Sequence, residues 1–189
     1  MNIFVLSPSA YFSAYALCDK HVPKMLLESI QMLVSALRSR GITSDTLIEY
    51  GVLTKAGNPI KGGYKHHPCT IWTGRRRDNF IWLLNHAQAL SDEYARRFGK
   101  KHALTEPLKG INTIFYTYQI ELWKPHEHEG TPFAQAMPEE YQCNNAVVAY
   151  RNYYLAEKHF AKWEKGRPAP SWYEGDWLQD FDRDKILSP

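Results

Sequence analysis

The sequence has no long apolar run. No stretch of its 189 residues reaches the roughly 18 consecutive apolar residues that a membrane-spanning helix needs. The N-terminus does not show a basic region followed by a long apolar one, so no secretory signal peptide is predicted. We therefore expect no membrane association and a cytoplasmic location, in a bacterial cell or a phage-infected host.

Cysteine is also scarce. The chain has three cysteines, an odd number without any Cys-x-x-Cys pair, and this pattern fits reduced thiols in a cytosol. They are Cys18, Cys69 and Cys143. Residues 66–69 and 126–128 combine histidines and a cysteine at spacings that make weak zinc candidates. We assign no metal ligand and no cofactor.

Other absences narrow the class of chemistry. The sequence contains no internal repeat, no low-complexity tract, no glycine-rich phosphate cradle and no Gly-x-Ser-x-Gly elbow. The first two absences argue against a repeat protein and a biased, disordered one. The last two argue against P-loop nucleotide binding and α/β-hydrolase chemistry.

What is present is enough apolar material for a core and an uneven distribution of charge. Hydrophobic residues make up 44% of the chain and aromatic residues 14%, which suits one domain with a full core. The net charge is +3, but residues 174–185 hold five acidic and two basic residues, so this segment carries −3 and the remaining body +6. Basic residues cluster at 75–77, 96–101 and 158–167. Such clusters are typical of a protein that binds phosphate backbones, although scattered solubilising charge also explains them.

The acidic C-terminal segment forms an extension of the main domain. We place the domain boundary after residue 173, with residues 174–189 as the extension. The extension also holds five large apolar residues: Trp177, Leu178, Phe181, Ile186 and Leu187. Because these side chains need to be buried, we expect the extension to dock on the domain.

The hydrophobic periodicity predicts a mainly α fold, a single compact domain of three long helices joined by long loops. The helices are expected at residues 11–40 with a kink or break at Pro23, at residues 68–98, and at residues 145–165. Residues 42–65, 100–110 and 125–138 are expected to be irregular, and residues 111–123 suit either a helix or a strand. In the second helix, a stripe from Phe80 to Ser91 is expected to be buried, with Asn79 and His86 elsewhere.

The first long helix has two contrasting faces. At 3.6 residues per turn, one face is apolar and consists of Val22, Leu26, Ile30, Leu33 and Leu37. The other face gathers charged and polar residues, namely Lys20, His21, Lys24, Glu28 and Gln31. This pattern fits the solvated side of a surface helix, in which Lys24 and Glu28 form an ordinary ion pair. It also fits a cationic surface that carries one functional carboxylate.

The same stretch resembles the pyrimidine-dimer DNA glycosylase family, the endonuclease V-like enzymes of T-even phages. The family pattern is Leu-x-Asp-x-His-Leu with a catalytic Glu seven residues after the His, and five residues here keep that spacing: Leu17, Asp19, His21, Val22 and Glu28. Further similarities follow in the same order at residues 67–99, 137–141 and 150–173. The resemblance therefore extends over most of the chain.

The resemblance implies a base-excision enzyme that acts on double-stranded DNA as a monomer. Glu28 would stabilise the positive charge that develops on the sugar when the N-glycosidic bond breaks, or would polarise the nucleophile. Asp19 and His21 would orient the site, and His21 would assist proton transfer. The residues expected to contact DNA are Lys20, Lys24, His67, Arg75, Arg76, Asn79, Lys158, Lys162, Trp172 and Tyr173.

Two departures from the family leave alternatives open. The family nucleophile is the amine of a processed N-terminal Thr, whereas this chain begins Met1-Asn2. The nucleophile is then the Met1 amine, Lys20 or Lys24, with abasic-site lyase activity through a Schiff base, or else water activated by Glu28. Leu27 and Gln31 stand near the places of two family arginines. The substrate is therefore a pyrimidine dimer by family default, or another modified pyrimidine. The alternative function is a non-catalytic DNA-binding protein on the same fold.

Overall fold

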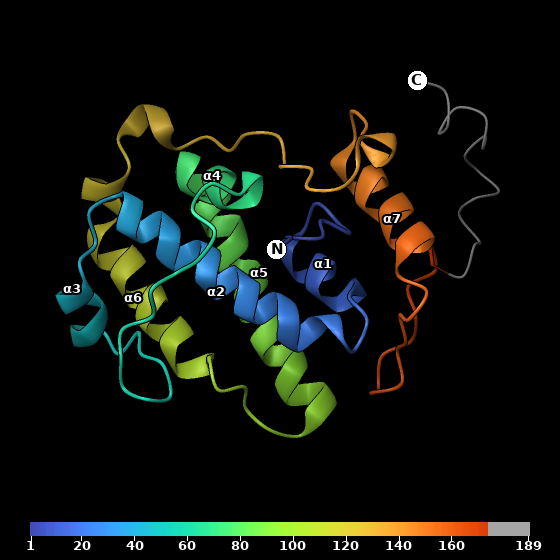
Figure 1. The fold of residues 1–189 in the computed structure, drawn as a ribbon, viewed down its shortest axis with the longest axis horizontal. Helices are drawn as coiled ribbons and strands as arrows, with labels where there is room; N and C mark the ends of the chain where they lie inside the picture. Colours follow the sequence, from blue (N-terminus) through green and yellow to red (C-terminus); the bar gives the residue numbers. More distant parts are fainter. Residues whose placement is uncertain (174–189) are drawn as a thin grey trace.

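Seven α-helices and two short 3-10 helices carry residues 1–173, the part of the chain that this computed structural model describes (Figure 1). The helices are α1 (Ala10–Ala16), α2 (His21–Ser39), α3 (Ser44–Glu49), α4 (Pro68–Arg75), α5 (Arg77–Phe98), α6 (Thr105–Leu122), η1 (Pro125–Glu127), η2 (Glu139–Tyr141) and α7 (Ala146–Glu157). Between residues 1 and 173 the only pairing of extended backbone is an isolated bridge of Leu53 with Pro59. The predicted mainly α fold is confirmed, whereas the docking of residues 174–189 lies outside the described residues.

Helix α2 crosses the middle of the molecule and packs against α5 and α4 (Figure 1). Its predicted apolar face is fully buried, and these residues are Val22, Leu26, Ile30, Leu33 and Leu37. Burying a side chain of this size contributes about 1.5–3 kcal/mol. Burial of this apolar face therefore fixes α2 in the core, and the opposite face of the helix can carry functional residues.

The predicted helix over residues 11–40 is interrupted, but not at Pro23. Residues 17–20 separate α1 from α2, and Leu17 has an extended backbone. Pro23 is the third residue of α2. The first N–H groups of a helix have no intrahelical partner, so the N–H that proline lacks would have been unpaired in any case.

The other long helices also differ from the predicted ranges. Arg76 has an extended backbone, with φ −138° and ψ 150°, and divides the predicted helix over residues 68–98 into α4 and α5. Helix α6 begins at Thr105, inside the segment predicted to be a loop, and α7 ends at Glu157 rather than near residue 165. Helix α3 lies within the segment predicted to be irregular. A tertiary contact accompanies the division at Arg76, whereas α3 has a local signal, the Thr43 side chain that caps its N-terminus.

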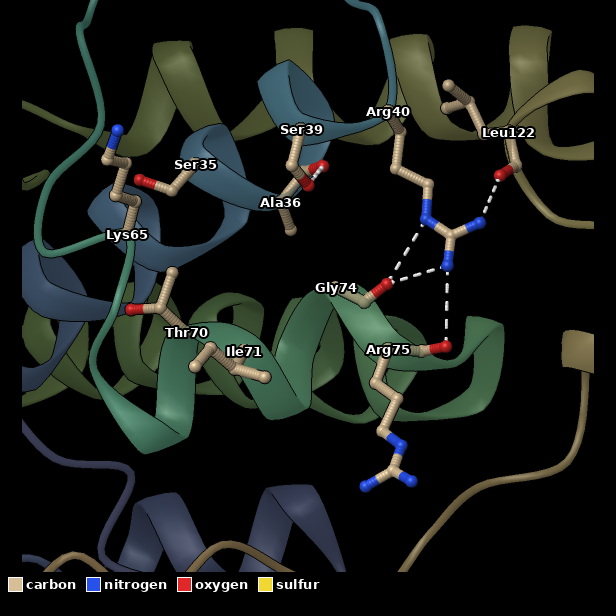
Figure 2. Close-up of a pocket in the computed structure, with 10 residues that line it drawn as sticks. All are labelled: Ser35, Ala36, Ser39, Arg40, Lys65, Thr70, Ile71, Gly74, Arg75 and Leu122. Atoms are coloured by element: carbon tan, nitrogen blue, oxygen red, sulfur yellow. Dashed lines mark hydrogen bonds between the residues drawn. The ribbon is translucent and has the colours of Figure 1, made fainter.

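Arg40 is one such contact, at the end of α4 (Figure 2). Its guanidinium donates hydrogen bonds to the carbonyl oxygens of Gly74 and Arg75 at 2.8 and 3.3 Å, and to that of Leu122 at 2.6 Å. It also pairs with Glu127 at 2.9 Å. The side chain of the C-cap residue of α2 thus satisfies the last carbonyl groups of both α4 and α6, and this holds the three helices together. A cavity of about 750 Å³ opens beside it between α2 and α4.

Two polar residues of α5 that were predicted to lie outside the buried stripe are buried. Asn79 is 1% exposed and His86 is 0% exposed. The Asn79 amide donates to the Trp72 carbonyl and to Thr131, and its oxygen accepts from the Thr131 N–H. His86 shares a 2.9 Å hydrogen bond with the Ala10 carbonyl. Their partners come from other segments, which explains why the periodicity of α5 alone does not predict their burial.

A buried ion network ties the start of α2 to α5 and to the C-terminal segment. The Arg97 side chain is 0% exposed and donates to Glu93 at 2.9 Å and to Asp19 at 3.1 Å. Arg167 donates to the same Glu93 carboxylate. Burial would raise the pKa of Glu93, but hydrogen bonds from the two arginines hold it below its ordinary value. Glu93 therefore stays ionised inside the protein.

Candidate active site

The carboxylate of Glu28 faces the first residues of the chain. The Asn2 backbone N–H donates to Glu28 Oε2 at 2.7 Å, and the α-amine of Met1 lies 3.9 Å from the same oxygen. On the other side, Lys24 Nζ lies 3.9 Å from Oε1. The Glu28 side chain is 12% exposed and that of Met1 is 1% exposed. A partly buried carboxylate therefore stands between two amines at the entrance to the core.

Several tertiary contacts hold the N-terminal segment in this position. The Asn2 side chain donates to the Ala136 carbonyl and accepts from the N–H groups of Ile3 and Phe4. Phe4 has a φ of 36°, a left-handed conformation that is rare for an aromatic residue. It stacks on the His21 ring with 4.8 Å between the centroids. Asn2 is thus a site residue that was not predicted from the sequence, in which the available signal was a polar residue at the start of the apolar segment 3–6.

His21 is buried under Phe4 rather than exposed on the polar face of α2. It is 3% exposed, and its Nδ1 lies 2.7 Å from the hydroxyl of Tyr154. Burial, with Lys24, Lys158 and Lys20 nearby, lowers the pKa of His21 to about 4. The imidazole is therefore neutral near pH 7. This geometry favours a positioning role, in which His21 supports Phe4, over the predicted role in proton transfer.

The two buried histidines make stability depend on pH. Burial also lowers the pKa of His86 to about 4, so both rings bind protons more weakly in the folded chain than in the unfolded chain. Their contribution to the free energy of unfolding should be complete above about pH 6.5 and should fall progressively as the pH drops toward about 4. Urea unfolding at a series of pH values measures the slope of the free energy of unfolding against pH.

A matched pair of variants tests which residues cause the slope. His86→Phe should reduce the slope whatever it does to absolute stability, because phenylalanine does not titrate. His159→Gln should leave the slope unchanged, because His159 is exposed. Constant stability of the unmodified protein between pH 7 and pH 4 would contradict the assignment.

Asp19 is occupied by structural contacts. Its Oδ1 accepts from Arg97, and its Oδ2 accepts from the backbone N–H groups of Glu164 and Lys165 at 2.6 and 3.1 Å. Its own N–H donates to the Lys162 carbonyl. The side chain therefore fixes the turn before α2 against the C-terminal segment, and it acts on the site only through that turn.

Three lysines gather on one side of Glu28. Lys20, Lys24 and Lys158 all act electrostatically on His21, although Lys158 comes from the far end of α7. Lys20 lies over the Phe160 ring at 4.5 Å, and Lys158 over the Tyr153 ring at 4.1 Å. The fold thus brings together predicted cationic residues that are distant in sequence.

The opposite side of Glu28 is formed by the start of α4 and the loop before it. His67 caps α4 by accepting from the Cys69 N–H at 3.2 Å. Partial burial and the nearby α-ammonium lower the pKa of His67, against the effect of Glu28. Tyr64 is 69% exposed and has a φ of 51°. Its carbonyl accepts from the His67 N–H at 2.8 Å, so this exposed aromatic residue borders the site.

The remaining predicted contact residues lie in several environments. Arg75 and Arg76 are at the far end of α4 from His67, and Arg76 donates to the His126 carbonyl. Lys162 is exposed and pairs with Glu164 at 3.5 Å. Trp172 is 5% exposed and packs on Tyr154, and Tyr173 packs on Trp163. Asn79 and Trp172 thus have structural roles, and we do not include them in the DNA surface proposed below.

The weak zinc candidates do not form a metal centre within residues 1–173, where no group of three His, Cys, Asp or Glu side chains is arranged to hold a metal ion. Cys69 is buried next to the Tyr150 hydroxyl, and burial raises the pKa of its thiol to about 12. The thiol is therefore protonated near pH 7. Its neighbour His66 is exposed.

The helical fold and the N-terminal segment held against Glu28 beneath a cationic surface fit the class of DNA glycosylases. The family model described as pyrimidine dimer DNA glycosylase matches residues 1–106, more than half of the chain, and the chain belongs to this family. The matched part contains Glu28 and its neighbours, His67 and all of α5. The searches of curated proteins and of solved structures returned no match.

Membership of the family identifies the chain as a DNA repair glycosylase whose substrate is DNA. Among residues 1–173, no helix combines the length and the apolar character that crossing a bilayer demands.

Proposed function

We propose that the chain excises a pyrimidine of a dimer from double-stranded DNA and then cleaves the resulting abasic site. The observation that carries this proposal is the position of the first backbone nitrogens against Glu28, with the Asn2 N–H at 2.7 Å and the Met1 amine at 3.9 Å from one carboxylate oxygen. A carboxylate and an amine side by side are the two groups that this chemistry needs.

Glu28 acts on the sugar. When the N-glycosidic bond breaks, the bonding electrons go to the base, which stays joined to the other base of the dimer, and positive charge develops at C1′. A fixed, partly buried carboxylate stabilises that charge without reorganising. The neutral amine then attacks C1′ and loses a proton, and the sugar opens to an imine. Loss of a proton from C2′ breaks the bond to the 3′ oxygen, which completes the lyase step.

The Met1 amine is the proposed nucleophile, and Lys24 is the alternative. Both nitrogens lie 3.9 Å from a Glu28 oxygen, but the Met1 side chain is 1% exposed and the Lys24 side chain is 61% exposed. The buried Met1 side chain and the contacts of Asn2 restrict the position of the amine, whereas an exposed lysine side chain samples many positions. Lys20 lies over the Phe160 ring, so we assign it to phosphate binding and not to nucleophilic attack.

Borohydride trapping on a duplex with an abasic site tests this mechanism. A covalent protein–DNA adduct is expected, with the DNA on the peptide that carries residue 1. The adduct should persist in Lys24→Arg and disappear when the α-amine is acetylated, because an acetylated nitrogen forms no imine.

Each of the other outcomes supports a different nucleophile or a different function. An adduct that survives acetylation and is lost in Lys24→Arg makes Lys24 the nucleophile. Base excision without any adduct favours water activated by Glu28. A protein that binds the duplex but neither excises a base nor cross-links contradicts the proposal and favours a non-catalytic DNA-binding role.

The proposed DNA surface surrounds Glu28. Lys20, Lys24 and Lys158 contact phosphates on one side, and His67 and the 61–65 loop contact the strand on the other. Arg75, Arg76 and Lys162 extend the surface outward. The monomeric state and the cytoplasmic location stay predictions.

A further inference from the structure

The N-terminal segment contacts α2 at two places. The Asn2 N–H donates to Glu28 at 2.7 Å, and the Phe4 ring stacks on His21 with 4.8 Å between the centroids. His21 and Glu28 are seven residues apart, so they lie on one face of α2, about 10.5 Å apart along the helix axis. Whatever fixes Phe4 on His21 therefore also limits where residues 1 and 2 lie beside Glu28.

The backbone of Phe4 needs support from its neighbours. A φ of 36° is unfavourable for a residue with a Cβ, and it persists only where several contacts determine it together. The Asn2 side chain accepts from the Phe4 N–H at 3.0 Å. The Ser13 hydroxyl donates to the Phe4 carbonyl at 2.9 Å and accepts from the Leu6 N–H at 3.0 Å. The stacking of the ring on His21 is the contact that joins this turn to α2.

His21 in turn depends on Tyr154 of α7. The Tyr154 hydroxyl lies 2.7 Å from His21 Nδ1, which has no other hydrogen-bond partner within residues 1–173. The same hydroxyl oxygen accepts from the Cys18 N–H at 3.1 Å. Tyr154 and Cys18 are both 0% exposed, and Tyr154 also contacts the Phe4 ring edge-on, with 5.4 Å between the centroids. One buried hydroxyl thus connects the start of α2 with the ring beneath Phe4.

The direction of this hydrogen bond fixes the state of the imidazole. Burial raises the pKa of the Tyr154 hydroxyl well above its ordinary value, so the hydroxyl keeps its hydrogen. His21 is neutral near pH 7 because burial and three lysines lower its pKa to about 4. Since the hydroxyl oxygen accepts from Cys18, its hydrogen is free to donate to Nδ1, and the imidazole hydrogen is then on Nε2.

We propose that Tyr154 is a positioning residue of the active site: through the His21 ring and Phe4, its hydroxyl fixes the N-terminal amine beside the catalytic carboxylate. This inference rests on the proposed function, in which that amine is the nucleophile. Tyr154 is 0% exposed, so it touches neither DNA nor the reacting atoms and acts only through its neighbours. It lies on α7, beyond the residues 1–106 that the family model matches.

Tyr154→Phe in the full chain tests the proposal, because it keeps the ring and removes only the hydroxyl. Imine formation on a duplex with an abasic site, followed by borohydride trapping with protein in excess, should slow by roughly tenfold or more, because the amine loses its fixed position. Affinity for a duplex with a tetrahydrofuran abasic analogue should be unchanged, because the phosphate-binding lysines are not altered. An unchanged rate of imine formation, or a loss of affinity as large as the loss of rate, would overturn the proposal.

A double-mutant cycle with His21→Phe separates positioning from a purely structural role. Tyr154→Phe also leaves the Cys18 N–H without its partner, but this cost occurs in both backgrounds and cancels in the cycle. In the His21→Phe background, a phenylalanine ring packs on Phe4 without needing a donor. There Tyr154→Phe should change the rate of imine formation by less than about twofold. A tenfold effect in both backgrounds would contradict a route through His21.

Tyr153→Phe is the matched control on the same helix. The Tyr153 ring also stacks on Phe4, with 6.2 Å between the centroids, but its hydroxyl makes no hydrogen bond within residues 1–173. Removing this hydroxyl should leave imine formation unchanged. A loss as large as that of Tyr154→Phe would show that the hydrogen bond to His21 is not the cause.

Two measurements do not require catalysis. Nitrogen NMR of the imidazole should show His21 with its hydrogen on Nε2 at pH 7, and amide hydrogen exchange at Asn2 should be faster in Tyr154→Phe than in Tyr153→Phe. A hydrogen on Nδ1, or equal exchange in the two variants, would overturn the positioning role. Absence of both base excision and imine formation by the unmodified protein would instead overturn the proposed function, and these two measurements would still decide whether Tyr154 holds the N-terminal segment.

Discussion

Replacing Glu28 with glutamine is expected to slow base excision by roughly a hundred- to a thousandfold, the usual effect of removing one preorganised electrostatic contact to a transition state. Glutamine keeps the size and helix propensity of the side chain but cannot stabilise a sugar cation. DNA affinity should be unchanged or slightly higher, since a negative charge near the phosphates is lost. Single-turnover excision of a dimer-containing duplex measures the rate, and equilibrium binding measures the affinity.

A carboxylate in an ordinary surface ion pair provides the control. Glu106 pairs with Lys109 at 2.9 Å and its side chain is 65% exposed, so Glu106→Gln should leave excision unchanged. Near-normal excision by Glu28→Gln would show that Glu28 is only the ion-pair partner of Lys24. The catalytic assignment would then be lost, together with the reading of the N-terminal amine as its partner.

Arg97→Met is expected to destabilise the fold by about 3–5 kcal/mol. Methionine fills part of the space but leaves Glu93 buried with one arginine instead of two. The carbonyl groups of Tyr15 and Leu17, which accept from Arg97 at 3.0 and 2.8 Å, lose their partners as well. Denaturant unfolding measures the free energy, provided that the slope of the transition is unchanged.

The adjacent arginine is the matched control. Arg96 is exposed in the same helical turn, and Arg96→Met should change stability by no more than about 0.5 kcal/mol. If Arg97→Met cost less than about 1 kcal/mol, the network of Glu93, Asp19 and Arg167 would not be a determinant of stability. Hydrogen bonds to water would then replace these contacts with little loss of stability.

The sequence predicts the elements whose signal is local. The apolar face of α2 is predicted correctly because burial repeats with the helical period, from Val22 to Leu37. The break before α2 is misplaced because Pro23 is tolerated in a first turn, and only the tertiary contacts of residues 17–20 show where the chain turns. The division at Arg76 was not predicted because it depends on Arg40, a residue 36 positions earlier in the chain.

In the candidate site too, local signals were predicted from the sequence and tertiary contacts were not. Glu28 was predicted from the spacing of a motif, and the fold places the N-terminal segment against it. The burial of His21 was not predicted, because its partners Phe4 and Tyr154 come from opposite ends of the chain. For Asp19 the motif position was informative, but its contact with the 164–165 backbone has no signature in the sequence.

The contacts of Asn2 have a consequence for the order in which the protein matures. The family match ends at residue 106, yet Asn2 is held by Ala136, and Phe4 packs against Tyr150 and Tyr154. Asn2 therefore receives part of its support from a residue 134 positions later in the chain. Until α7 has been synthesised and has docked, the N-terminal segment lacks its contacts with Tyr150 and Tyr154 and keeps only those with earlier residues such as Ser13 and His21. A nascent or truncated chain without α7 can thus carry every residue of the motif and still lack the full set of contacts that position the N-terminal segment.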